Sequence, residues 1–204
     1  MAMNKPALFK FAGLFLLAYL ALLGLSLQFG HHYVESLLPL YRWEIGWLSP
    51  DYRITGLALA DNRGEAVVAL NLQLVRYTIV AGHWLTPGGD LSSSTLAGHA
   101  LQHVLLMLSL LIASPTKSIL HRLVLLAIAM PLLLLIEILD VPLVLLGSID
   151  DLILANVAPN SSSLLVAWMN FMNGGGRLAL SIAGAVVVIG SANWFIGRLK
   201  YAST

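Results

Sequence analysis

Long apolar runs alternate with polar segments along this chain, and four of the runs are long enough to form membrane-spanning helices. The central pair occupies residues 95–113 and 123–147, joined by a short basic link at 114–122. Further runs extend over 11–29 and 178–197. About 20 apolar helical residues cross roughly 30 Å of hydrocarbon. The pattern therefore predicts a membrane protein, mainly α, with four transmembrane helices.

The stretch 31–94 has ordinary polarity and predicts a small extracytoplasmic α/β segment. Residues 34–47 mix apolar and aromatic side chains with charged ones, which is typical of a short helix on the membrane surface. We expect this helix to be separate from the first span and to be interrupted at Pro39, because proline removes a helical hydrogen bond.

A β-hairpin is predicted within the same stretch. Apolar and polar residues alternate over 65–77, and this run and 52–60 flank a turn at 61–64, whose residue types tolerate left-handed conformations. Two strands alone are marginal in water, so the hairpin should rest on the membrane, on the preceding helix or on a partner. Residues 92–95 are Ser and Thr, good N-cap types, and predict the start of the second span.

Residues 148–177 predict an extracytoplasmic or interfacial loop. Positions 148–151 resemble a capping box and favour a new short helix that ends before Pro159. The apolar run 163–172 is too short to span a bilayer unaided, and the glycines at 174–176 favour a break after it. The domain layout that follows is an N-terminal transmembrane helix (1–30), the extracytoplasmic segment (31–94) and a three-helix transmembrane region (95–204).

Composition agrees with a membrane protein and excludes several function classes. Of the 204 residues, 58% are hydrophobic and 10% charged, whereas a soluble domain has about 25% charged residues. The mean hydropathy is +0.85. A net charge of +1 gives no electrostatic reason to expect nucleic acid as a partner. The absence of cysteine excludes disulfides, thiolate metal ligands and a cysteine nucleophile.

Basic residues predict the orientation of the chain. With four spans, one side of the membrane carries all the lysines, together with Arg122 and Arg198. The other arginines are spread through longer loops. Because lysine and arginine near span ends favour the cytoplasm, we expect both termini there. The lipid bilayer is an expected partner of the spanning helices.

Five ionisable side chains are predicted to share one layer near the outer ends of the spans. His99 and His103 are four apart on the second helix, and Glu137 and Asp140 are three apart on the third. Arg177 opens the last helix at a similar level. Ionisable groups at membrane depth are costly, which makes such a layer a functional-site hypothesis.

Three interpretations of this polar layer stay open. Arg177 can pair with one of the two acids while the histidines bond across helices, a purely structural role. The layer can form a proton relay or a polar groove. His99, His103 and Glu137 can instead hold a divalent metal, although no HExxH motif is present. Apart from that metal, no cofactor is expected.

The layout resembles a family of small bacterial inner-membrane proteins encoded with exosortases, the exosortase H-associated membrane proteins. Exosortases are membrane transpeptidases that process proteins with a C-terminal sorting helix. The resemblance rests on the first helix from Phe11, the β-rich segment 43–74, the approach 82–90 and the helical pair 95–147. No diagnostic short motif accompanies it.

The resemblance implies an accessory role in protein sorting. Exosortases use a Cys, an Arg and a His, and the missing cysteine disfavours a transpeptidase role here. The implied function is a non-catalytic subunit that positions cargo or enzyme, with an exosortase as membrane partner. Two alternatives from other classes are an intramembrane metal-dependent hydrolase using His99, His103 and Glu137, and a small transporter subunit.

Overall fold

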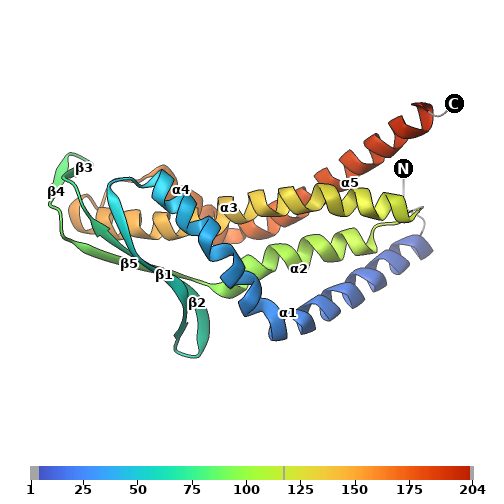
Figure 1. The fold of residues 1–204 in the computed structure, drawn as a ribbon, viewed down its shortest axis with the longest axis horizontal. Coiled ribbons are helices and arrows are strands. Elements are labelled where there is room, and N and C mark those ends of the chain that lie inside the picture. Colours follow the sequence, from blue (N-terminus) through green and yellow to red (C-terminus); the bar gives the residue numbers. More distant parts are fainter. Residues whose placement is uncertain (1–4, 117, 203–204) are drawn as a thin grey trace. The chain divides into compact units, whose positions relative to one another are not determined.

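The computed structural model describes residues 5–116 and 118–202 and is mainly helical, with a small antiparallel sheet (Figure 1). In chain order the elements are α1 (Lys5–Leu48), β1 (Tyr52–Asn62), β2 (Glu65–Leu74), β3 (Thr78–Val80), β4 (His83–Leu85), β5 (Asp90–Leu96), α2 (Ala97–Ala113), α3 (Ile119–Val157), α4 (Leu164–Phe171), the π-helical turn Met172–Gly176 and α5 (Arg177–Ala202). The predicted class, helices with a small β segment, is confirmed.

The described chain divides into two units, each with its own hydrophobic core. The unit that we call the bundle unit takes in the chain up to Phe29, Gln102–Ile136 and the chain from Leu178 onward. The unit that we call the sheet unit consists of Gly30–Leu101 and Glu137–Arg177. Helices α1 and α3 therefore contribute one half to each unit.

Helix α1 is one continuous helix, so the predicted separate surface helix, interrupted at Pro39, is wrong. The helix runs for 44 residues with Pro39 inside it. Its second half buries a stripe that includes Val34, Leu37, Tyr41 and Ile45 at helical spacing. Packing of this stripe against the core outweighs the hydrogen bond that proline removes, which the local sequence could not indicate.

The predicted hairpin is confirmed, and a third strand joins it. β1 and β2 pair antiparallel around the turn, where Arg63 and Gly64 have positive φ, and β5 pairs with the other edge of β2. The prediction that residues 92–95 start a helix is wrong, because they lie in β5 and the helix begins at Ala97. β3 and β4 form a separate two-stranded sheet that we did not predict.

One irregularity in β1 preserves the orientation of its side chains. The register shifts between Ile54 and Gly56. Ile54 faces the core before this bulge, and Leu57 and Leu59 face it afterwards. A bulge adds one residue, so the apolar positions keep to one face although their spacing changes from even to odd.

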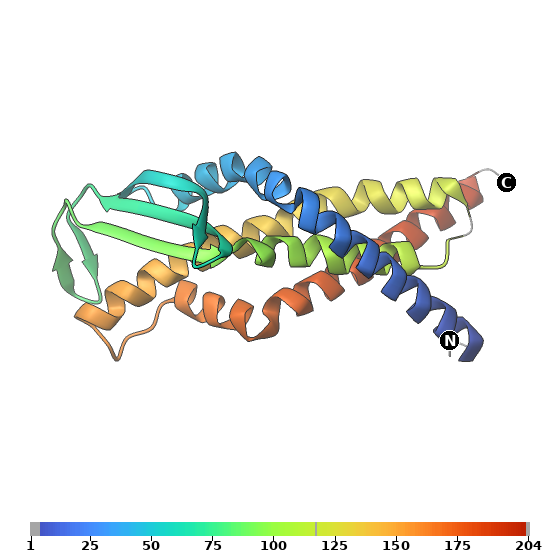
Figure 2. The same ribbon diagram turned by 90° about the horizontal axis from the view of Figure 1, so that it is seen from below.

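The inner face of the three-stranded sheet packs on two helices of the same unit. Val68, Leu70 and Leu72 of β2 are buried against the second halves of α1 and α3. Figure 2 shows the three-stranded sheet beside these parts of the two helices. The expectation that the hairpin rests on another element is confirmed, with α1 as the preceding helix and α3 as a second support. Ser93 of β5 adds a hydrogen bond of 3.1 Å from its Oγ to the carbonyl oxygen of Leu145.

Helix α3 is longer than expected and passes through both of its prolines. It covers 39 residues, about 58 Å at 1.5 Å per residue, well beyond the predicted end at 147. The capping-box prediction at 148–151 is wrong because these residues continue the helix. Ile149 and Ile153 are buried in the core of the sheet unit, so packing extends the helix past a local start signal.

The core of the bundle unit is formed by α2, α3 and α5. Its members include Met107, Leu125 and Val188, all buried. Three helices of the described chain are long and apolar enough to cross a membrane: Lys5–Leu48, Ile119–Val157 and Leu164–Arg198 across its kink. The remaining apolar helix, Ala97–Ala113, has 17 residues and is shorter than that criterion.

The glycine run bends the chain without ending the helical course, so the predicted break appears as a kink. Gly175 has a φ of 114°, which favours glycine, and sits in the π-helical turn. A Cβ on Gly176 would lie 2.7 Å from the carbonyl oxygen of Phe171. Both glycines are thus required for the turn that leads directly into Arg177.

Close packing between α3 and α4 predicts opposite effects for two glycine substitutions. A Cβ on Gly147 would lie 2.5 Å from the carbonyl oxygen of Leu165, whereas a Cβ on Gly190 would meet nothing within 4 Å. Gly147→Ala should lower the free energy of unfolding by about 1–3 kcal/mol through overpacking. Gly190→Ala should raise it by about 0.5–1 kcal/mol through helix propensity. Thermal unfolding in detergent measures both, and equal shifts would contradict the contact.

Candidate functional site

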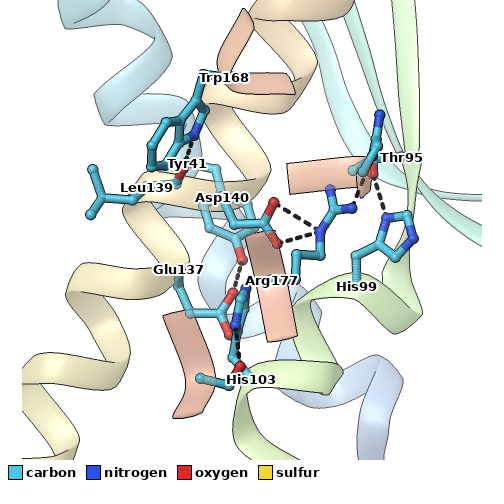
Figure 3. Close-up of polar contacts among 11 residues, drawn as sticks. Tyr41, Thr95, His99, His103, Glu137, Leu139, Asp140, Trp168 and Arg177 are labelled. Carbon is cyan, nitrogen blue, oxygen red and sulfur yellow. Dashed lines mark hydrogen bonds and ion pairs between the residues drawn. The ribbon is translucent and has the colours of Figure 1, made fainter. Parts of the chain in front are cut away.

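Several buried or half-buried polar side chains of the sheet unit form what we call the polar cluster: Tyr33, Tyr41, His99, Glu137, Asp140 and Arg177. Within it, Glu137 ties α3 to α1. Its side chain is fully buried. Tyr41 donates its hydroxyl to Oε2 at 2.9 Å (Figure 3), and Tyr33 donates its hydroxyl to Oε1 at 3.1 Å. Each carboxyl oxygen therefore has a phenolic donor, which is the condition for burying a carboxyl group at acceptable cost.

Asp140, one helical turn after Glu137, ties α3 to the start of α5. The Arg177 Nε lies 2.8 Å from Oδ2 and 3.0 Å from Oδ1 of Asp140, and both side chains are buried (Figure 3). Nη1 of Arg177 also donates to Oδ1 of Asn173 at 2.9 Å. Of the two acids considered as partners for Arg177, the ion pair within hydrogen-bond distance is with Asp140.

The two histidines have different partners in different units. Nδ1 of His99 lies 2.9 Å from the hydroxyl of Thr95, within the sheet unit. His103 is fully buried in the bundle unit, with its Nδ1 2.9 Å from the hydroxyl of Ser181. The His103 contact joins α2 to α5, as expected for a side chain that helps to hold a bundle together. The Thr95 contact of His99 is local, four residues back along the chain, and does not cross between helices.

Sequence reasoning found the acids and the arginine but missed the tyrosines. Tyr33 and Tyr41 are eight residues apart, which places them on one face of a continuous helix two turns apart. The signal was therefore present in the sequence. It was hidden because a predicted interruption at Pro39 separated the two tyrosines. The hydroxyl partners of the histidines carried no comparable signal.

The contacts described above are side-chain hydrogen bonds and one ion pair. Among the residues that the structure describes, no three His, Asp or Glu side chains gather into a group that would hold a metal ion. Arg177 compensates the buried charge of Asp140, and the two tyrosines supply hydrogen-bond donors to the carboxyl group of Glu137. α3 is the common element, since it carries both acids and connects to α1 through one and to α5 through the other.

The sheet of the same unit offers a second candidate surface, its outer face and edge. Among the described strands, β1 pairs only with β2, so its other edge carries unpaired backbone groups. A shallow groove of about 470 Å³ crosses the outer face and is lined by polar side chains that include Asn71, Asp90 and Ser92. Backbone donors and acceptors and small polar side chains together favour recognition of a peptide chain.

One end of β1 lies close to acidic side chains. Burial raises the pKa of Tyr52, the first residue of the strand, and the negative charges of Asp150 and Asp51 raise it further. The phenol therefore stays protonated throughout the physiological range and is a hydrogen-bond donor there.

The buried ion pair predicts non-additive effects of mutation. Arg177→Met should destabilise the protein by about 3–5 kcal/mol, because Asp140 loses its buried partner. Arg177→Met combined with Asp140→Leu should cost less than the sum of the single changes. Unfolding by SDS in mixed micelles measures all three variants. Strict additivity would show that the two side chains are not energetically coupled.

Comparison with known proteins adds no residue assignment to this site. No protein-family model, curated protein or solved structure matches this chain. The role of the cluster and of the sheet edge therefore has to be argued from their own contacts.

Proposed function

We propose that this chain is a non-catalytic accessory subunit of an exosortase-type protein-sorting system in a bacterial inner membrane. Four helices would span the bilayer, with both termini in the cytoplasm. The sheet would lie outside and bind an extended segment of a membrane partner or its cargo. The observation that carries the proposal is the unpaired edge of β1, on a sheet whose inner face is anchored to α1 and α3.

The surface of the bundle unit supports the membrane location. Large apolar side chains are exposed along its helices, among them Leu17, Leu123 and Val187, although its core is already filled. Such a surface suits hydrocarbon, where outward-facing side chains have no reason to be polar. With 17 residues, α2 reaches the lower limit of the usual range for a transmembrane helix, which supports four spans.

The distribution of charge supports the orientation. The sequence of the bundle unit contains no Asp or Glu. Its six basic residues lie at its chain ends, in the α2–α3 link and in the first turn of α3: Lys5, Lys10, Lys117, Arg122, Arg198 and Lys200. All ten acids of the chain belong to the sheet unit. Lysine and arginine next to spans favour the cytoplasmic side, which supports a cytoplasmic position for the link.

The edge of β1 supports a docking role because of its length and its fixed register. The strand covers 11 residues, long enough for an added strand to form several backbone hydrogen bonds. Its bulge at Thr55 and the anchoring of Leu57 and Leu59 in the core hold the edge in one conformation. A preorganised edge binds an extended peptide with a smaller loss of conformational entropy.

The polar cluster supports a structural role for the ionisable residues of the sheet unit. Glu137, Asp140, Arg177 and His99 all have hydrogen-bond partners within that unit. This arrangement fits a rigid support for the sheet better than a group poised for chemistry. The specific link to exosortases comes from the resemblance in layout and is the part of the proposal that needs a partner to be identified.

The proposed orientation predicts a clear difference between two single-cysteine variants. The chain has no cysteine, so Arg63→Cys in the β1–β2 turn and Ser118→Cys in the α2–α3 link would each carry one thiol. Both positions are exposed. In intact cells, a membrane-impermeant maleimide should label position 63 and leave position 118 unlabelled until the inner membrane is permeabilised. Labelling of both positions in intact cells would refute the orientation.

The docking proposal predicts that partner capture is concentrated on the edge of β1. Photo-crosslinking residues at Ala58 and Ala60, exposed in β1, should capture a membrane partner in native membranes. The matched control is Asn71, which is exposed on the outer face of the neighbouring central strand. An added strand lies beside β1 and one strand away from Asn71, so capture there should be several-fold weaker.

Two other results would each have a definite meaning. Strong capture at Asn71 and weak capture at Ala58 would place the partner on the sheet face and contradict strand addition. No captured membrane protein at any of the three positions would contradict the accessory role itself. Identification of the captured protein by mass spectrometry tests the exosortase assignment separately.

A further inference from the structure

A groove of about 270 Å³ lies within the bundle unit, where the end of α2 meets the start of α3. One cationic side chain, Arg122, lines the groove. The other lining side chains are aliphatic: Leu108, Leu111, Ile112, Leu125 and Leu126. An aliphatic groove with a single positive charge at one end is complementary to an amphiphile that has a long hydrocarbon chain and a negatively charged head.

Arg122 is held at the mouth of this groove by the α2–α3 link. Its Nε donates a hydrogen bond of 2.9 Å to Oγ1 of Thr116, and the side chain remains exposed. The other guanidinium nitrogens are not part of that bond. A guanidinium fixed through one nitrogen offers its remaining donors in a planar fork, which matches the oxygens of a phosphate.

The position of Arg122 is electrostatically unfavourable without an anion. It lies in the first turn of α3, where the helix macrodipole is positive, and no acidic residue occupies that turn. The sequence of the bundle unit contains no acid that would compensate the charge. The local field therefore favours an anionic ligand at this end of the groove.

We propose that the groove binds an anionic phospholipid, with one acyl chain between α2 and α3 and the phosphate on Arg122. The inference rests on the proposed membrane location. It goes beyond the docking role, since it assigns a lipid to the bundle unit, whose net charge is opposite in sign to that of the sheet unit. The aliphatic lining argues for a lipid and against a free phosphate, because inorganic phosphate has no apolar part to bury.

Native mass spectrometry of the full chain in detergent, titrated with phosphatidylglycerol or phosphatidylcholine, tests the headgroup. The wild-type chain should retain phosphatidylglycerol preferentially. Arg122→Gln should weaken that retention about five- to tenfold, in line with one cation at a membrane surface plus its hydrogen bonds. The matched control is Arg198→Gln. Arg198 is also exposed but stacks on the Trp194 ring at 4.2 Å and does not line the groove, so retention should be unchanged.

A second variant tests the acyl chain. Ile112→Trp should fill the groove and lower retention of phosphatidylglycerol while Arg122 is intact. Ile112 is half-exposed, so the larger side chain should be tolerated by the fold, and an unchanged thermal midpoint verifies this. An excess of inorganic phosphate should not displace the lipid, and displacement would show that a free anion binds there.

Three outcomes would overturn the lipid site. They are equal retention of the two phospholipids by the wild-type chain, equal losses for Arg122→Gln and Arg198→Gln, and unchanged retention in Ile112→Trp. None of these results bears on cysteine labelling or on partner capture at β1. Conversely, a failed partner capture leaves the lipid measurements valid, so failure of one proposal is distinguishable from failure of the other.

Discussion

The sheet unit depends on two buried acids, one helical turn apart on α3, that must each find a partner on a different helix. Glu137 takes hydroxyl donors from α1, and Asp140 takes the guanidinium at the start of α5. A buried ion pair adds little net stability relative to an apolar pair, but an unmatched charge is very costly. Any slippage of one helix by a turn would break these contacts, so the acids determine the register in which α1, α3 and the start of α5 meet.

That register in turn determines where the sheet can lie. Val68, Leu70 and Leu72 of β2 need an apolar surface, and the second halves of α1 and α3 form one only when they are held side by side. On these helices the sheet buries an apolar face that would otherwise be exposed to water. The position of the outer edge of β1 therefore depends on how α1 and α3 pack. A docking surface on this edge would be held in place by the contacts of the polar cluster.

Local signals in the sequence predicted only what local interactions decide. The turn 61–64 predicted the hairpin because its residue types determine the backbone there, and Glu137, Asp140 and Arg177 were recognisable because charges are rare in apolar runs. Pro39, the capping pattern at 148–151 and the N-cap types at 92–95 all misled, since in each case contacts with distant residues determined the structure. Pairing of β5 with β2 joins residues 17 to 29 positions apart, which no periodicity within either strand reveals.

The segregation of charge connects the two proposed surfaces. The bundle unit has six basic residues and no acid, and the sheet unit has all ten acids with five arginines, so the two units carry net charges of opposite sign. Anionic lipids attract basic residues at a membrane surface by about 1 kcal/mol each. In the proposed orientation, Arg122 beside an aliphatic groove would convert that general attraction into a defined contact. A lipid held there would support α2, the shortest of the apolar helices other than α4 in the described chain, where the protein itself supplies the fewest spanning residues.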